Sequence, residues 1–119
     1  DYFQIINSKL GVNRVAYEIT AFIQRNFMNK NLSISLLSES LNLTPAYLCQ
    51  VFKRETGKTI NDYINEYRVE KAKEFLKERN TKLLEISGNS GYNDVKYFTK
   101  TFKKITGITP SEFREKFLR

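Results

Sequence analysis

Residues 47–59 read YLCQVFKRETGKT, and residues 97–109 read YFTKTFKKITGIT. Six positions are identical at an offset of fifty: Tyr47 and Tyr97, Phe52 and Phe102, Lys53 and Lys103, Thr56 and Thr106, Gly57 and Gly107, Thr59 and Thr109. Each stretch carries apolar residues at helical spacing and then reaches a glycine, which readily takes the left-handed conformation that ends a helix. The repeat therefore predicts two copies of one helical unit.

Helical periodicity and capping residues predict seven helices, over residues 14–29, 34–41, 45–56, 60–78, 82–89, 94–106 and 110–117. Prolines 45 and 110 suit first helical positions. The residues expected to cap helices have short polar side chains, and they are Ser33, Thr44, Asn80 or Thr81, Asn93 or Asp94, and Thr109 with Glu112 as a capping box.

The order of the predicted helices indicates an all-α fold with two helix-turn-helix subdomains joined by a long bridging helix. In each unit a short helix and a turn precede a longer helix. We expect residues 14–58 to form the first subdomain, 59–79 the bridging helix and 80–119 the second subdomain. Residues 1–13 are expected to be a linker or the end of an upstream helix.

The two helices of the repeat have one apolar face and one polar face. The residues expected to face the core are Tyr47, Leu48, Val51 and Phe52, then Tyr97, Phe98, Thr101 and Phe102, with Tyr63 and Tyr67 also inward. The residues expected on the opposite faces are Ala46, Cys49, Gln50, Lys53 and Arg54, then Val95, Lys96, Thr99, Lys100, Lys103 and Lys104.

The charge balance points to a polyanionic partner. The chain has 119 residues and a formal net charge of +7, and the helix at 94–106 carries four lysines with no acid between Asp94 and Glu112. A solvated helix face usually mixes both signs, whereas a phosphate backbone favours one. A lysine-rich face is also common on an ordinary soluble surface, but the duplicated helix-turn-helix favours nucleic acid.

Several classes of function are disfavoured by what the sequence lacks. It has no histidine and one cysteine, so Cys/His zinc sites, histidine-based catalysis and an internal disulfide are excluded. No glycine loop of the phosphate-cradling kind occurs. We therefore expect no enzyme, no cofactor and no metal. No apolar run approaches the roughly 20 residues that a membrane-spanning helix needs.

Two other kinds of helical module remain as alternatives. One is a protein-interaction module, and the other binds RNA without specific reading of a duplex. RNA-binding domains usually display exposed aromatic platforms, whereas the aromatic residues here are expected to point inward. A redox role for the lone Cys49 is disfavoured because no basic neighbour in the sequence would lower the pKa of its thiol.

The motifs LTPAYLCQVFKRETGKTINDYINEYRVEKAKEFL at 43–76 and LLEISGNSGYNDVKYFTKTFKKITGITPSEFR at 83–114 resemble the DNA-binding domain of the AraC/XylS family of bacterial transcription regulators. The resemblance covers about residues 14–117 and is nearest to the output domains of YesN-like response regulators. It implies two recognition helices in successive major grooves of double-stranded DNA, a cytoplasmic location, RNA polymerase as a possible partner, and an upstream sensor or receiver domain that this fragment lacks.

The resemblance also assigns roles to individual residues. Those implied to contact bases are Ala46, Cys49, Gln50, Val95, Lys96, Thr99 and Lys100. Those implied to hold phosphates, together with the helix N-termini, are Thr44, Lys53, Arg54, Asn93, Lys103 and Lys104. We expect Gln50 to pair with adenine and the second unit to supply more of the electrostatic attraction.

The structural residues are expected to be Gly57, Gly107, Asp94 and Arg68. Arg68 lies at the edge of the apolar stripe of the bridging helix, and we expect an ion pair, for example with Asp94, rather than a phosphate contact. Ser38 and Ser87 stand where the family prefers alanine. Their hydroxyls are expected to bond back to the carbonyl four residues earlier.

Overall fold

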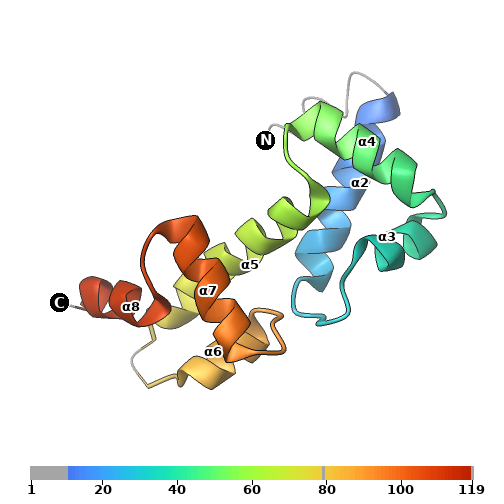
Figure 1. The fold of residues 1–119 in the computed structure, drawn as a ribbon. Coiled ribbons are helices and arrows are strands. Elements are labelled where there is room, and N and C mark those ends of the chain that lie inside the picture. Colours follow the sequence, from blue (N-terminus) through green and yellow to red (C-terminus); the bar gives the residue numbers. More distant parts are fainter. Residues whose placement is uncertain (1–10, 79, 119) are drawn as a thin grey trace. The chain divides into compact units, whose positions relative to one another are not determined.

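The computed structural model describes residues 11–78 and 80–118, and it confirms an all-α fold in that part of the chain (Figure 1). The described residues form seven helices: α2 Gly11–Asn26, α3 Ile34–Leu41, α4 Pro45–Thr56, α5 Ile60–Leu76, α6 Leu83–Asn89, α7 Val95–Thr106 and α8 Pro110–Leu118. The predicted bounds of α3 and α4 were correct. The linker expected at residues 1–13 lies outside the described residues, apart from the start of α2.

The chain forms two compact units. Unit 1 contains α2, α3, α4 and the start of α5 up to Ile64, and unit 2 contains Phe27–Lys30 and everything from Asn65 onward. Helix α5 thus contributes residues to both units. Each unit has a hydrophobic cluster of its own.

The core of unit 1 forms where α4 packs against α2 and α3. Leu48 and Phe52 of α4 are completely buried, together with Ile19 and Ile23 of α2. The ring of Phe52 meets the ring of Tyr63 edge to face, with 5.7 Å between centroids, a geometry that aromatic pairs prefer. The apolar face predicted for α4 is therefore its buried face at Leu48, Val51 and Phe52, but not at Tyr47.

The core of unit 2 repeats this arrangement with α7 in place of α4. Phe98 and Phe102 are completely buried among Val69, Ala72 and Leu76 of α5, and Ile86 of α6 and Tyr92 complete the cluster. Figure 1 shows α7 beside α5 and α6, with α8 following it. The burial of Phe98 and Phe102 leaves the lysine-bearing side of α7 facing solvent.

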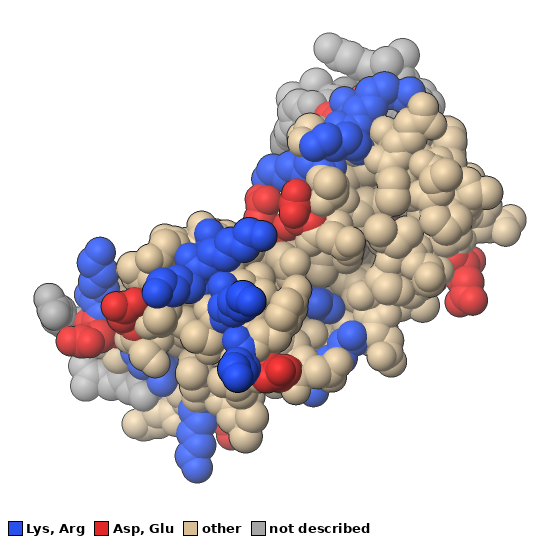
Figure 2. Space-filling model, in the orientation of Figure 1, with Lys and Arg blue, Asp and Glu red and all other residues tan. Residues whose placement is uncertain are grey.

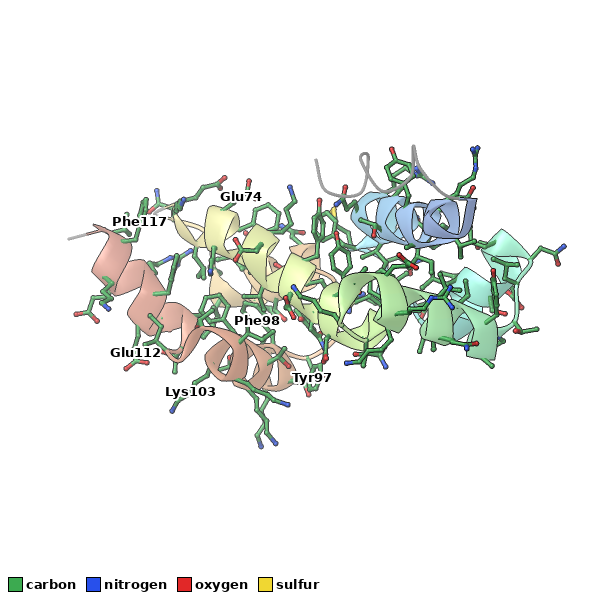
Figure 3. All side chains as sticks on the ribbon, turned by 90° about the horizontal axis from the view of Figure 1, so that it is seen from above. Glu74, Tyr97, Phe98, Lys103, Glu112 and Phe117 are labelled. Atoms are coloured by element: carbon green, nitrogen blue, oxygen red, sulfur yellow. The ribbon has the colours of Figure 1, made fainter. Side chains whose placement is uncertain are left out.

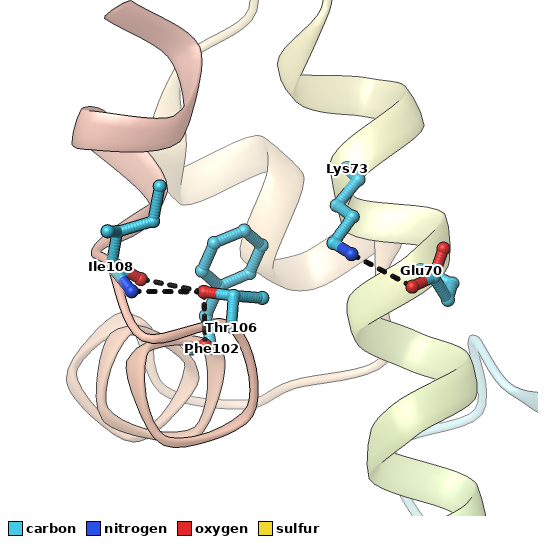
Figure 4. A network of polar contacts seen from close by, with 5 residues as sticks. All are labelled: Glu70, Lys73, Phe102, Thr106 and Ile108. Carbon is cyan, nitrogen blue, oxygen red and sulfur yellow. Dashed lines mark hydrogen bonds and ion pairs between the residues drawn. The ribbon is translucent and has the colours of Figure 1, made fainter. Parts of the chain in front are cut away.

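Threonine and glycine end α4 and α7 in the same way, which explains why the sequence repeats them. The N–H groups of Gly57 and Gly107, at φ 78° and 91°, donate to Lys53 and Lys103 carbonyls. The Thr106 hydroxyl lies 2.8 Å from the Phe102 carbonyl and accepts from the Ile108 N–H at 3.3 Å (Figure 4). Thr56 makes the matching bonds in unit 1. These bonds satisfy carbonyls and N–H groups that a helix end would otherwise leave without partners.

The predicted caps are mostly confirmed. Ser33 and Thr44 cap α3 and α4, and Thr109 and Glu112 form a reciprocal capping box at α8. The hydrogen bonds from Thr109 hold the pKa of the Glu112 carboxyl below its usual value. The expectation for α6 was wrong, because its N-cap is Lys82 without a side-chain bond.

Three local expectations differ from the structure. Helix α2 ends at Asn26 and not at residue 29, and the carbonyls of Phe27 and Asn29 accept from Arg68 instead. The Ser38 hydroxyl bonds forward to the Leu43 carbonyl, 2.5 Å away, and not back to the preceding turn. The Ser87 hydroxyl is buried and has no hydrogen-bond partner in the described chain. Neither serine therefore makes the expected bond to the carbonyl four residues earlier.

Gly91 occupies a position that no other residue could fill without distortion. Its φ is +99°, and a Cβ there would collide with the Phe27 carbonyl oxygen and with the guanidinium of Arg68. Gly57 also has a positive φ, but a Cβ there would meet nothing within 4 Å. Substitution of Gly57 therefore tests the cost of backbone strain alone, whereas substitution of Gly91 adds the cost of a clash.

We expect Gly91→Ala to lower the free energy of unfolding by about 2–5 kcal/mol, because strain and overpacking act together. Gly57→Ala, the matched control, should cost only about 1–2 kcal/mol from strain. Urea denaturation followed by circular dichroism measures both. Equal losses in the two variants would show that the close approach at Gly91 does not matter.

Candidate nucleic-acid interface

The exposed face of α4 is nearly free of net charge at its centre. Ala46 and Gln50 are exposed and Cys49 is half-buried. Cys49 and Gln50 line a hollow with Ile34 and Ile60. Short apolar side chains and one amide can make apolar contacts with thymine methyl groups and a paired hydrogen bond with adenine. The face of α4 is chemically suited to reading A·T pairs.

The cations of α4 are engaged with its own C-terminal end. The Lys53 ammonium donates to the Gly57 carbonyl at 3.1 Å, and Arg54 lies 3.4 Å from the Glu55 carboxylate. Both side chains of these cations are exposed, and exposed contacts of this kind contribute little energy. They can therefore exchange these contacts for phosphate oxygens at small cost.

The exposed face of α7 is strongly basic. Lys96, Lys100, Lys103 and Lys104 are all exposed, and Thr99 and Val95 are half-buried beside them. Figure 2 shows basic side chains gathered over this helix. In the described part of the chain, no carboxylate lies within ion-pair distance of these four lysines. In contrast, Lys71 and Lys73 of α5 pair with Glu74 and Glu70.

The N-termini of the two helices differ in charge. The neutral Thr44 hydroxyl caps α4 by accepting from the Tyr47 N–H at 3.2 Å. At α7 the Asp94 carboxylate accepts from the Lys96 N–H at 2.8 Å. An anion already at a helix N-terminus satisfies the helix dipole and repels a second anion. The α4 N-terminus can take a phosphate directly, whereas α7 must rely on side chains such as those of Asn93, which is exposed, and the lysines.

The prediction that Tyr47 and Tyr97 face the core was wrong. Tyr47 is 40% exposed and Tyr97 is 53% exposed. With about 100° of rotation per residue, each tyrosine lies at the flank of its helix, one position before the buried Leu48 or Phe98. Figure 3 shows Tyr97 and Lys103 pointing away from the core toward which Phe98 points. Tyr63 and Tyr67 are half-buried, nearer to their expected positions.

Arg68 is buried in unit 2, where its guanidinium contacts backbone carbonyls and an aromatic ring. It is 8% exposed, and it donates to the carbonyls of Phe27 and Asn29, each at 2.9 Å. Its guanidinium carbon lies 5.3 Å from the ring centroid of Tyr92, within cation–π range. The Tyr92 hydroxyl donates to Asn65 Oδ1 at 2.9 Å. Burial lowers the pKa of Arg68 and raises that of Tyr92.

The expected ion pair between Arg68 and Asp94 does not form. Asp94 instead caps α7, and two backbone carbonyls and an aromatic face take the place of a carboxylate around the guanidinium. Gly91 leaves the space that this arrangement needs. Asn65 lies within α5 and Tyr92 in the turn before α7, and nothing in the sequence marks either residue as part of this network.

Two structural findings limit the chemistry of the described residues. They contain no group of His, Cys, Asp or Glu side chains suited to holding a metal ion. None of their helices combines the length and the apolar character needed to span a bilayer.

A family model described as a helix-turn-helix domain matches residues 37–116. This match covers more than half of the chain and contains α4 and α7, the helices whose exposed faces are described above. The chain belongs to the AraC-type helix-turn-helix family. The AraC-type resemblance of the two sequence motifs is thereby confirmed.

The relatives of this AraC-type domain are bacterial regulators. YesN of Bacillus subtilis (strain 168), an uncharacterised transcriptional regulatory protein, is 42% identical over 91 residues, which are 74% of this chain and 25% of YesN. The arabinose operon regulatory protein of Escherichia coli (strain K12) is 30% identical over 102 residues, which are 86% of this chain and 35% of that protein. The AraC-type domain therefore spans well under two thirds of these regulators.

A solved structure shares the fold. The C-terminal domain of the two-component response regulator YesN from Fusobacterium nucleatum superposes with a TM-score of 0.79 at 37% identity, and the match covers 82% of this chain and 95% of that one. The AraC-type domain here thus corresponds to an almost complete domain of that regulator.

We expect Arg68→Ala to lower the free energy of unfolding by about 2–4 kcal/mol, because it removes a buried guanidinium's two hydrogen bonds to the carbonyls of Phe27 and Asn29 and its contact with the Tyr92 ring. Arg14→Ala is the matched control, since Arg14 is exposed and, among the described residues, pairs with Glu18 on the same helix, and it should cost less than about 0.5 kcal/mol. Chemical denaturation of both variants tests this. A loss at Arg68 no larger than that at Arg14 would contradict a structural role.

Proposed function

We propose that this chain is the DNA-binding domain of a bacterial transcription regulator, and that it binds double-stranded DNA sequence-specifically through α4 and α7. The observation that carries the proposal is the exposed face of α7, where four lysines have no ion-paired carboxylate within the described chain. Such a face attracts a phosphate backbone and releases its counterions. The same helix-turn-helix is repeated in unit 1, which supplies a second, nearly neutral face.

The two recognition helices divide the work. In α4, Ala46, Cys49 and Gln50 contact bases, with Gln50 pairing to adenine. In α7, Lys96 and Lys100 contact bases together with Val95 and Thr99. Phosphates are held by Thr44, Lys53, Arg54, Asn93, Lys103 and Lys104. Unit 1 then contributes mainly selectivity and unit 2 mainly affinity.

The two units bind successive major grooves, and residues 59–79 act as the bridge between subdomains 14–58 and 80–119. Support comes from the length of α5, whose 17 residues give a rod of about 26 Å, somewhat shorter than the roughly 34 Å between successive grooves. One chain would then read two sites, a task for which many helix-turn-helix proteins dimerise.

The domain is the output part of a longer regulator of the YesN-like response-regulator kind. The chain spans only 25% of YesN, which leaves room for an upstream sensor or receiver domain. Transcription regulation on bacterial DNA places the protein in the cytoplasm, with RNA polymerase as a possible further partner. The domain itself needs no cofactor and performs no catalysis.

RNA binding is the second candidate, and one observation supports it. The exposure of Tyr47 and Tyr97 removes part of the case against it, because exposed aromatic rings are the usual platforms for unpaired bases. Competition between duplex DNA and single-stranded RNA of equal length distinguishes the two functions. Preference for the RNA would reject the DNA-binding proposal.

We expect selection from random duplexes to yield one sequence motif. Footprinting on a duplex with that motif should show two protected zones about 10 base pairs apart. Gln50→Ala should lose about 1–3 kcal/mol of discrimination at one adenine position while other positions keep their preference. Lys103→Gln is the contrasting variant. It should weaken all sequences alike and reduce the salt slope by about one unit.

Footprinting, affinity measurements and a salt titration on the selected duplex give these quantities. A single short protected zone would contradict binding by two recognition helices. An unchanged adenine preference in Gln50→Ala would contradict the role assigned to that amide.

A further inference from the structure

Tyr47 and Tyr97 occupy the same place in the two recognition helices. Each is the third residue of its helix, because α4 begins at Pro45 and α7 begins at Val95. Their exposed fractions, 40% and 53%, are large for aromatic residues next to a core. Such a matched exposure in both copies of a repeat calls for a common role.

Both tyrosines flank the face that carries the base-contacting and phosphate-contacting residues. Residues three and seven positions later lie on the same side of a helix. For α4 these are Gln50 and Arg54, and for α7 they are Lys100 and Lys104. Each helix therefore has one edge formed by a tyrosine at its N-terminal turn, a long polar side chain and a cation.

The ring of Tyr97 is supported on one side. It meets the ring of Tyr92 edge to face with 5.8 Å between centroids, and Tyr92 is itself fixed by Asn65 and Arg68. The ring of Tyr47 lines a shallow hollow with Asn42, Leu43 and Thr44 at the start of α4. The contact with Tyr92 restricts the ring of Tyr97 on one side, and both tyrosines stay exposed on the other.

The two hydroxyl groups have no hydrogen-bond partner within the described chain, although each can donate one proton. Tyr92, which is buried, does have a partner for its hydroxyl. The stacked bases of a duplex offer no free face on which an exposed phenol ring could stack. A phenol beside a DNA-facing surface therefore acts mainly as a hydrogen-bond donor. Tyrosine hydroxyls are among the groups that donate to DNA phosphate oxygens.

We propose that Tyr47 and Tyr97 are a matched pair of DNA-backbone anchors, each donating its hydroxyl to a phosphate oxygen beside the groove that its helix enters. The inference rests on the proposed function. A phenol has few rotatable bonds, so a restricted ring fixes the position of its helix along the groove more sharply than a lysine does. The anchors set the register in which the neighbouring residues meet the bases.

The test uses Tyr47→Phe and Tyr97→Phe, which remove only the hydroxyl oxygen. On a duplex selected by the wild-type chain, each variant should bind about three- to tenfold more weakly. The salt slope should stay unchanged because a phenol releases no counterion, unlike Lys103→Gln. Melting temperatures should match the wild type, since neither hydroxyl has a partner in the described chain.

Tyr17→Phe on α2 is the matched control, because it removes the same atom from a half-buried residue outside the two recognition helices, and it should bind like the wild type. Ethylation interference locates the contact. One phosphate whose ethylation weakens the wild type should cease to matter in Tyr97→Phe, and a different one in Tyr47→Phe.

The outcomes distinguish a failure of the proposed function from a failure of the anchor role alone. Failure of the wild-type chain to bind any duplex would overturn the proposed function itself. Duplex binding that is unchanged in both variants would overturn only the anchor role. Weaker binding accompanied by a lower melting temperature, with the interference pattern unchanged, would assign the tyrosines to packing and would also overturn it.

Discussion

Burial of Phe52 on α4 and of Phe102 on α7 is the constraint on which the rest of each unit depends. When the apolar stripe of a helix packs into a core, the opposite stripe necessarily faces solvent. Each phenylalanine is completely buried, and deleting such a side chain typically costs about 3–5 kcal/mol. The exposed faces of Gln50 and Lys100 are thus held in place by apolar packing on the other side of the helix.

The second constraint is electrostatic and belongs to unit 2. A guanidinium placed in a core without a carboxylate needs other acceptors, since an unpaired buried charge is very costly. Arg68 meets this need with two backbone carbonyls and the face of Tyr92. The arrangement requires close approach of the chain at Gly91. It orients Tyr92, and through the ring contact it also orients Tyr97.

The two copies of the repeat have the same framework and different surfaces. Their closing Thr–Gly turns share the same bonds, because these bonds satisfy backbone groups at the helix end and do not depend on the exposed side chains. Their N-caps and exposed faces differ, with Thr44 and a face that is uncharged at its centre on α4 against Asp94 and four lysines on α7. The two copies therefore share the parts that hold a helix in position and differ in the residues that they expose.

The sequence by itself determined the helices, most of their caps and most of the division of each into a buried and an exposed face, because these follow from periodicity and local hydrogen bonding. The repeated Phe, Thr and Gly positions were correct for this reason. Only tertiary structure decided the partners of Arg68, the end of α2 at Asn26 and the exposure of Tyr47 and Tyr97. Each of these depends on which neighbour from a distant part of the chain reaches a group at the edge of a helix face. Helical periodicity places a residue on a face, but it does not say what packs there.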